Sequence, residues 1–116
     1  MRSESVIRAL AALAQEHRLA AFRLLVQAGP DGVPAGAVAD AVGVPASSMS
    51  FHLAQLTHAG LVTQRRQSRS IIYAADYAAM NSLMAYLMEN CCGSGECAPS
   101  VGCTVPVSEV DGKDVA

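Results

Sequence analysis

The first ninety residues of this 116-residue chain contain no cysteine, and all four cysteines fall between Cys91 and Cys103. The chain also lacks the run of about 18 apolar residues that a membrane-spanning helix needs. Its start, MRSESVIRAL, is too short and too charged for a secretory signal. We therefore expect a cytoplasmic protein with no membrane span. In that reducing compartment a cysteine cluster indicates metal binding, catalysis or redox sensing rather than a disulfide framework.

Acidic residues are absent from Ala41 to Ala75, although the formal net charge of the whole chain is −2. Arg65, Arg66 and Arg69 fall within that stretch, whereas the acids gather toward the C-terminal end. A phosphate-binding face needs local positive potential rather than a high overall charge. The middle of the chain can therefore bind nucleic acid.

The length fits one domain with a single core, small enough that a second copy would help to bury apolar surface. Residues 5–28 have the apolar spacing of helix, with a break near Glu16 and His17. GPDG, residues 29–32, stops the helix, and residues 35–42 and 45–60 then form two short helices joined at GVP. This order predicts a helix-turn-helix.

The second of these helices has two distinct faces. Met49, Leu53 and Leu56 are spaced to point inward. Ser47, Phe51 and Ala54 point outward, flanked by Ser48, Ser50 and Gln55. Small polar residues at a helix N-terminus can approach phosphates and base edges closely, so this is a candidate DNA-reading face.

Two strand-like runs follow, LVTQRR and RSIIY, around a turn near Gln67 and Ser68. A β-hairpin beside a helix-turn-helix is a wing, and its arginines can bind the DNA backbone. A last helix, about Tyr77 to Asn90, carries an apolar stripe that needs a partner surface. The stripe consists of Met80, Leu83, Met84, Leu87 and Met88.

The predicted fold is mainly α with a β-hairpin wing, a winged helix-turn-helix that forms a homodimer through its first and last helices. We expect residues 1–92 to form the DNA-binding and dimerisation domain. Residues 93–116, rich in Gly, Ser and Pro, are expected to be a flexible tail that contributes a sensor cysteine.

Three segments, HRLAAFRLL, SSMSFHLAQLTHAGLV and RRQSRSIIY, resemble the ArsR/SmtB family over about residues 15–75. Members of that family are small dimeric repressors that leave DNA when they bind a metal or metalloid. The resemblance implies a recognition helix with Ser47, Ser48, Ser50, Phe51 and His52 on or beside its reading face, and a wing with Arg65, Arg66 and Arg69. Phe51 replaces a common histidine, and Ser68 replaces the usual wing-tip glycine.

Two sensing sites of the family are missing here. PAGAVADAV has no thiol pair, and the last helix has neither the Asp nor the His of the zinc site. The remaining cysteines are similar to those of members whose arsenic-binding thiols lie in the C-terminal tail. Trivalent arsenic or antimony binds three sulfurs in a pyramid, and Cys91, Cys92 and Cys97 can supply them where Gly93 ends the helix. Cys103 is a possible extra ligand that looks dispensable.

The sequence thus predicts a repressor rather than an enzyme. The apo dimer needs no cofactor to bind double-stranded operator DNA, and As(III) or Sb(III) binding to the cysteine triad releases it. Two alternatives stay open: a thiol redox-sensing repressor, and a winged-helix interaction module whose cysteines form a structural zinc site.

Overall fold

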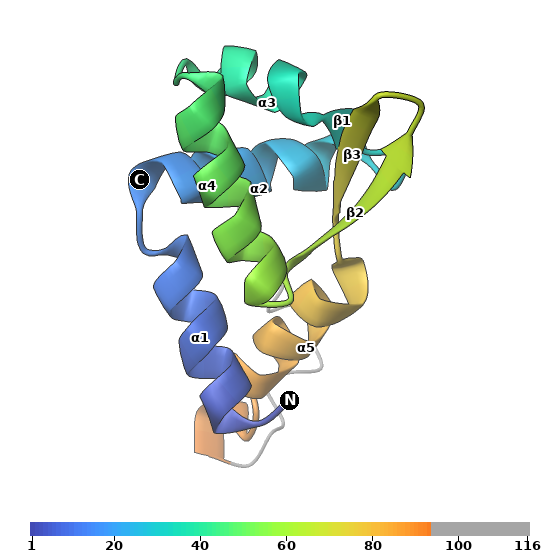
Figure 1. Ribbon diagram of the computed structural model, residues 1–116. Coiled ribbons are helices and arrows are strands. Elements are labelled where there is room, and N and C mark those ends of the chain that lie inside the picture. Colours follow the sequence, from blue (N-terminus) through green and yellow to red (C-terminus); the bar gives the residue numbers. More distant parts are fainter. Residues whose placement is uncertain (94–116) are drawn as a thin grey trace. The chain divides into compact units, whose positions relative to one another are not determined.

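A computed structural model describes residues 1–93 of the chain (Figure 1). Two compact units are found, Met1–Leu83 and the part from Met84 onward. No helix within residues 1–93 is long and apolar enough to cross a membrane. The elements in chain order are α1 Ser3–Leu13, α2 Glu16–Ala28, β1 Val33–Pro34, α3 Ala35–Val42, α4 Ala46–His58, β2 Val62–Gln67, β3 Ser70–Ala75, α5 Tyr77–Leu87 and a 3₁₀ turn Cys91–Gly93.

The expected break between the first two helices is confirmed. Gln15 has an extended backbone, and its side chain accepts a hydrogen bond of 2.9 Å from the backbone N–H of Arg18. That bond satisfies one of the donors that a helix start leaves without a partner in its own helix. Gln15 therefore lies at the break between the two helices and caps the start of α2, which runs in a different direction from α1.

The helix-turn-helix consists of α3 and α4. Gly43 takes a left-handed conformation, with φ 85°, and its N–H donates to the carbonyl of Ala39 at 2.8 Å. The inward face predicted for α4 is confirmed, because Met49, Leu53 and Leu56 are all 0% exposed. Figure 1 shows α4 running across α2, with the β2–β3 hairpin beside them.

The sheet has three antiparallel strands in the order β1-β3-β2. The two-residue strand β1 was not predicted, because two residues show no periodicity. Gly32 lets it pair with β3: a Cβ there would lie 2.6 Å from the carbonyl oxygen of Tyr73, and the φ of Gly32 is +80°. The hairpin turn falls at Ser68 and Arg69, one residue later than expected, and Ser68 adopts a φ of 58°.

Two side chains fix the start of α5. The carboxylate of Asp76 accepts from the N–H of Ala79 at 3.0 Å, which caps the helix. The hydroxyl of Tyr77 donates to the carbonyl oxygen of Val26 at 2.8 Å, joining the start of α5 to the end of α2. The first turn of α5 is thereby joined to α2 within the unit Met1–Leu83.

The end of α5 lies earlier than predicted, at Leu87 instead of Asn90. Asn90 has a φ of 57°, a left-handed conformation that Asn tolerates better than most residues. The helix is thus broken before Gly93, which was expected to end it. Cys91 and Cys92 lie in the 3₁₀ turn that follows. The predicted tail from residue 94 onward lies outside the described residues, and the predicted domain boundary at 92/93 stays a prediction.

Candidate DNA-binding face and cysteine sensor

The outer face of α4 carries most of the predicted DNA-reading residues. Phe51 is 58% exposed, the highest exposure of any large apolar residue on this helix. The small and polar residues around it are also exposed: Ser47, Ser48, Ser50 and Gln55. A large ring held in solvent by a helix whose opposite face is fully buried gains nothing for the monomer fold. It leaves one large apolar group exposed on the predicted DNA-reading face.

His52 lies to the side of this face and is half-buried against α2. Arg18 Nη1 lies 3.5 Å from His52 Nδ1, and the rings of His17 and His52 have centroids 5.7 Å apart. The pKa of His52 is lowered from its ordinary value by burial first, then by the positive charge of Arg18 and by His17. The structure therefore gives His52 a contact between helices, and its predicted contact with DNA stays a prediction.

The wing carries three exposed arginines, as expected. Arg65 Nη2 donates to the carbonyl oxygen of Asp31 at 2.9 Å, so this side chain also ties the loop before β1 to β2. Arg66 lines a shallow depression together with Gln64, Arg65 and Ile71. Arg66 and Arg69 are thus the wing arginines best placed to bind phosphates without first breaking a bond within the protein.

Charge on the unit Met1–Leu83 differs from charge on the whole chain. This unit has seven arginines and five acids, which gives a net charge of +2, while the formal charge of the full chain is −2. All of the positive excess therefore lies in the unit that holds α4 and the wing. Such a separation attracts a polyanion to that unit.

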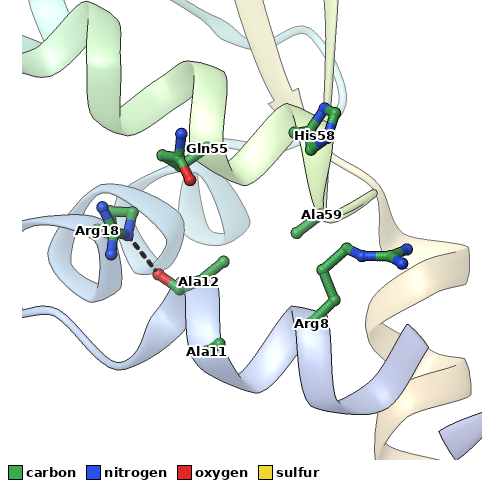
Figure 2. Close-up of a pocket in the computed structure, with 7 residues that line it drawn as sticks. All are labelled: Arg8, Ala11, Ala12, Arg18, Gln55, His58 and Ala59. Carbon is green, nitrogen blue, oxygen red and sulfur yellow. Dashed lines mark hydrogen bonds between the residues drawn. The ribbon is translucent and has the colours of Figure 1, made fainter. Parts of the chain in front are cut away.

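A pocket of about 260 Å³ lies between α1, α2 and the C-terminal end of α4. Figure 2 shows Arg18 and Gln55 on one side of it and Arg8 and His58 on the other. Three alanines, Ala11, Ala12 and Ala59, complete the lining. Sequence reasoning missed this pocket, because its polar residues come from three helices and no spacing along the chain joins them.

Two of the four cysteines, Cys91 and Cys92, lie within the described residues. Cys91 Sγ and Cys92 Sγ lie 3.7 Å apart. Cys97 and Cys103, the other two predicted sulfur ligands, lie outside the described residues. Within residues 1–93 no group of three or more His, Cys, Asp or Glu side chains could hold a metal ion. The structure therefore brings together two of the three sulfurs of the predicted triad.

Comparisons with known proteins agree with the architecture. A family described as a helix-turn-helix domain matches residues 13–65. The HTH-type transcriptional regulator YgaV of Escherichia coli (strain K12) is 30% identical over 79 residues, which cover 68% of this chain and 80% of that protein.

Two solved structures are similar in both sequence and fold. One is the homodimeric winged helix-turn-helix DNA-binding domain of Mb0332 from Mycobacterium bovis, described as a possible ArsR-family transcriptional regulator; it has a TM-score of 0.60 and 30% identity over 75% of this chain and 81% of that one. The other, described as a possible transcriptional regulator for arsenical resistance, has a TM-score of 0.61 and 30% identity over 68% of this chain and 79% of that one. The resemblance seen in the sequence is confirmed: this chain belongs to the ArsR family of winged helix-turn-helix transcriptional regulators.

Proposed function

We propose that this protein is a cytoplasmic repressor that binds operator DNA as an apo homodimer and dissociates when As(III) or Sb(III) binds to Cys91, Cys92 and Cys97. The assignment of these cysteines as the metalloid site is supported by the distance of 3.7 Å between Cys91 Sγ and Cys92 Sγ. With bonds of about 2.3 Å, the length of a Zn–S bond, two sulfurs on one ion lie at most about 4.6 Å apart. When both sulfurs are reduced to thiols, this separation is therefore short enough for one centre to bind both of them.

The irregular backbone after the end of α5 allows the sulfurs of neighbouring cysteines to lie this close. Successive side chains on a straight helix point about 100° apart, which separates their sulfurs. Asn90 and Cys92, with φ values of 57° and 61°, take the chain out of helical geometry on both sides of Cys91. The third sulfur would come from Cys97, after the short segment GSGE. Fixing the backbone of any residue costs about 1–2 kcal/mol, so the sulfur bonds must exceed this cost for each residue that they order.

The DNA side of the proposal rests on the exposed outer face of α4 and the exposed arginines of the wing. A recognition helix reads base edges with its N-terminal residues, while a neighbouring wing binds backbone. Dimerisation is supported by apolar side chains that remain in solvent. Ile7 on α1 is 66% exposed, and Leu10 is exposed as well. In the described part of the second unit, Met84, Leu87 and Met88 are large apolar residues that are exposed.

The test is operator binding by the reduced full chain, followed by titration with As(III), Sb(III), Zn(II) or hydrogen peroxide. Release of DNA by equimolar As(III) or Sb(III), with no release by peroxide, is the expected result. Release by peroxide that thiol reductant reverses would instead identify a redox sensor. Stoichiometric zinc in the purified protein, retained while DNA is bound, would identify a structural zinc site. Either of these results would contradict the metalloid assignment and leave DNA binding intact.

A further inference from the structure

The pocket between α1, α2 and α4 is built from groups that bind anions. Arg8, Arg18 and His58 supply two guanidinium groups and an imidazole, and Gln55 adds an amide. No acidic residue lines it. Neither of the two ion pairs found within residues 1–93 involves Arg8 or Arg18. Two permanently charged side chains thus line one small opening that has no carboxylate among its lining residues.

Arg18 is held in position rather than free to swing. Its Nε donates to the carbonyl oxygen of Ala12 at 2.7 Å, and its Nη1 lies 3.5 Å from His52 Nδ1. A guanidinium has five N–H donors in a fixed plane, so these two contacts leave donors on the same plane for a ligand. Planar pairs of N–H donors match the oxygens of a phosphate. Figure 2 shows this guanidinium beside the amide of Gln55, with the chain of Arg8 rising from α1 on the far side.

The pocket continues the DNA-reading face of α4. Gln55 and His58 follow Phe51 by four and seven residues, a spacing that keeps all three on one side of a helix. His58 lies eleven residues beyond Ser47, about 16 Å along the axis at 1.5 Å per residue. The major groove is about 12 Å wide. If α4 enters the groove by its N-terminal end, with its axis across the groove and Ser47 and Phe51 against base edges, it carries Gln55 and His58 past the groove, to the height of the phosphates.

We propose that this pocket binds a backbone phosphate of the operator, with Arg8 and Arg18 as the charged ligands and Gln55 and His58 as further donors. The inference rests on the proposed DNA binding and adds a third contact region to α4 and the wing. Its ligand is a phosphodiester, which carries no sequence information, so the pocket would position the protein on DNA rather than select a sequence. Each dimer would have two such pockets, one on each side of the operator.

Salt dependence of binding tests the proposal. Arg8→Gln removes one charge from the pocket, and Arg8 is exposed, so the fold does not depend on it. Arg23→Gln is the matched control, since Arg23 is an exposed arginine on α2 that does not line the pocket. Each phosphate contact contributes about 0.9 to the slope of log K against log salt. We expect Arg8→Gln to reduce the slope by about 1.8 for the two pockets of a dimer, equally for operator and unrelated duplexes, and Arg23→Gln to leave it unchanged.

Several outcomes would overturn the inference. An unchanged slope for Arg8→Gln, with parent protein that binds DNA, contradicts the pocket and leaves the proposed function standing. If the parent protein binds no duplex, both the phosphate pocket and the proposed function are contradicted. If inorganic phosphate raises the melting temperature of the parent but not of Arg8→Gln, while the slopes are equal, the pocket takes a free ion instead of DNA. If Arg8→Gln has a smaller mass than the parent in light scattering, the pocket is a contact between subunits and not a phosphate site.

Discussion

Arg18 Nη1 lies 3.5 Å from His52 Nδ1, and because a guanidinium can only donate, the imidazole must accept through a lone pair on Nδ1. The contact is a hydrogen bond only when His52 is neutral and carries its proton on Nε2. Arg18 also donates to the carbonyl oxygen of Ala12, so one side chain touches the end of α1 and the recognition helix from its place on α2. The orientation of α4, and hence of the candidate DNA-reading face, depends in part on this contact.

Stability should accordingly fall in mild acid. Burial, Arg18 and His17 lower the pKa of His52 in the folded protein, whereas the unfolded chain takes up its proton near pH 6.5. The unfolded state then binds more protons, so the contribution is complete above about pH 6.5 and is lost as pH falls toward the lower folded pKa. The free energy of unfolding in urea, determined at several pH values between 7.5 and 5, measures this contribution. His52→Gln should flatten the fall, and His58→Gln, which leaves the Arg18–His52 contact in place, should retain it. Equal curves for the two variants would show that His52 does not cause the loss.

Replacement by alanine should have opposite effects on stability at Gly32 and at Gly36. A Cβ on Gly32 would lie 2.6 Å from the carbonyl oxygen of Tyr73 at a φ of +80°, so Gly32→Ala must displace β1 from β3. The left-handed backbone alone costs about 1–2 kcal/mol. Gly36 lies in α3 with nothing within 4 Å of its Cβ position, and Gly36→Ala should stabilise by about 0.5–1 kcal/mol. Thermal melts of both variants decide it, and a neutral Gly32→Ala would contradict the close pairing described here.

Phe51→Ala should alter DNA discrimination without altering the fold. The ring is 58% exposed, so its loss should change the free energy of unfolding by less than about 0.5 kcal/mol. Contact of the ring with a thymine methyl contributes about 0.8 kcal/mol per methyl-sized group, or about fourfold in preference for the operator. Leu53→Ala, at a position 0% exposed on the same helix, is the contrast and should cost about 2–5 kcal/mol of stability. A large loss of stability in Phe51→Ala with full discrimination would place the ring in the core instead.

The wing arginines should act through phosphates. Arg66→Ala should weaken binding to every duplex about equally and reduce the salt slope by about 0.9 in each half-site. Arg65→Ala should do the same and also release the loop at Asp31, because Arg65 Nη2 donates to that carbonyl. Filter binding at a series of salt concentrations, with operator and scrambled duplex, separates the two effects. If Arg66→Ala binds DNA with the affinity of the parent at every salt concentration, Arg66 does not contact DNA.

The sequence predicted the parts of the structure that depend on local periodicity. Met49, Leu53 and Leu56 lie inside and Phe51 lies outside because a helix of known spacing leaves no other arrangement. It did not predict β1, which exists through pairing with β3 forty residues away. The Arg18–His52 contact and the pocket with Arg8 were missed for the same reason, since they join helices that are distant in sequence. The end of α5 was placed three residues late, because the helix ends at Leu87 and Asn90 already takes a left-handed backbone before Gly93.

Each of the three proposed sensor cysteines should be required for the release of DNA. A change from almost wholly bound to almost wholly free DNA requires a difference of about 5.5 kcal/mol in the binding of the inducer to the two states. Arsenic captures thiolates, and the proposed site uses three of them, so the loss of one sulfur removes one of three Cys–As bonds. Cys91→Ser, Cys92→Ser and Cys97→Ser should therefore each bind operator with parent affinity and fail to release it when As(III) is added.

Cys103→Ser is the matched control, because it removes one sulfur from the same part of the sequence and should respond as the parent does. The measurement is operator occupancy by fluorescence anisotropy during As(III) titration of the four reduced variants. Equal loss of response in all four would indicate a four-sulfur site. A normal response in Cys97→Ser would exclude the triad and leave the pair Cys91 and Cys92, with sulfurs 3.7 Å apart, as a two-sulfur site. Such a pair would select arsenicals with only two exchangeable ligands, because each Cys–As bond replaces one of them.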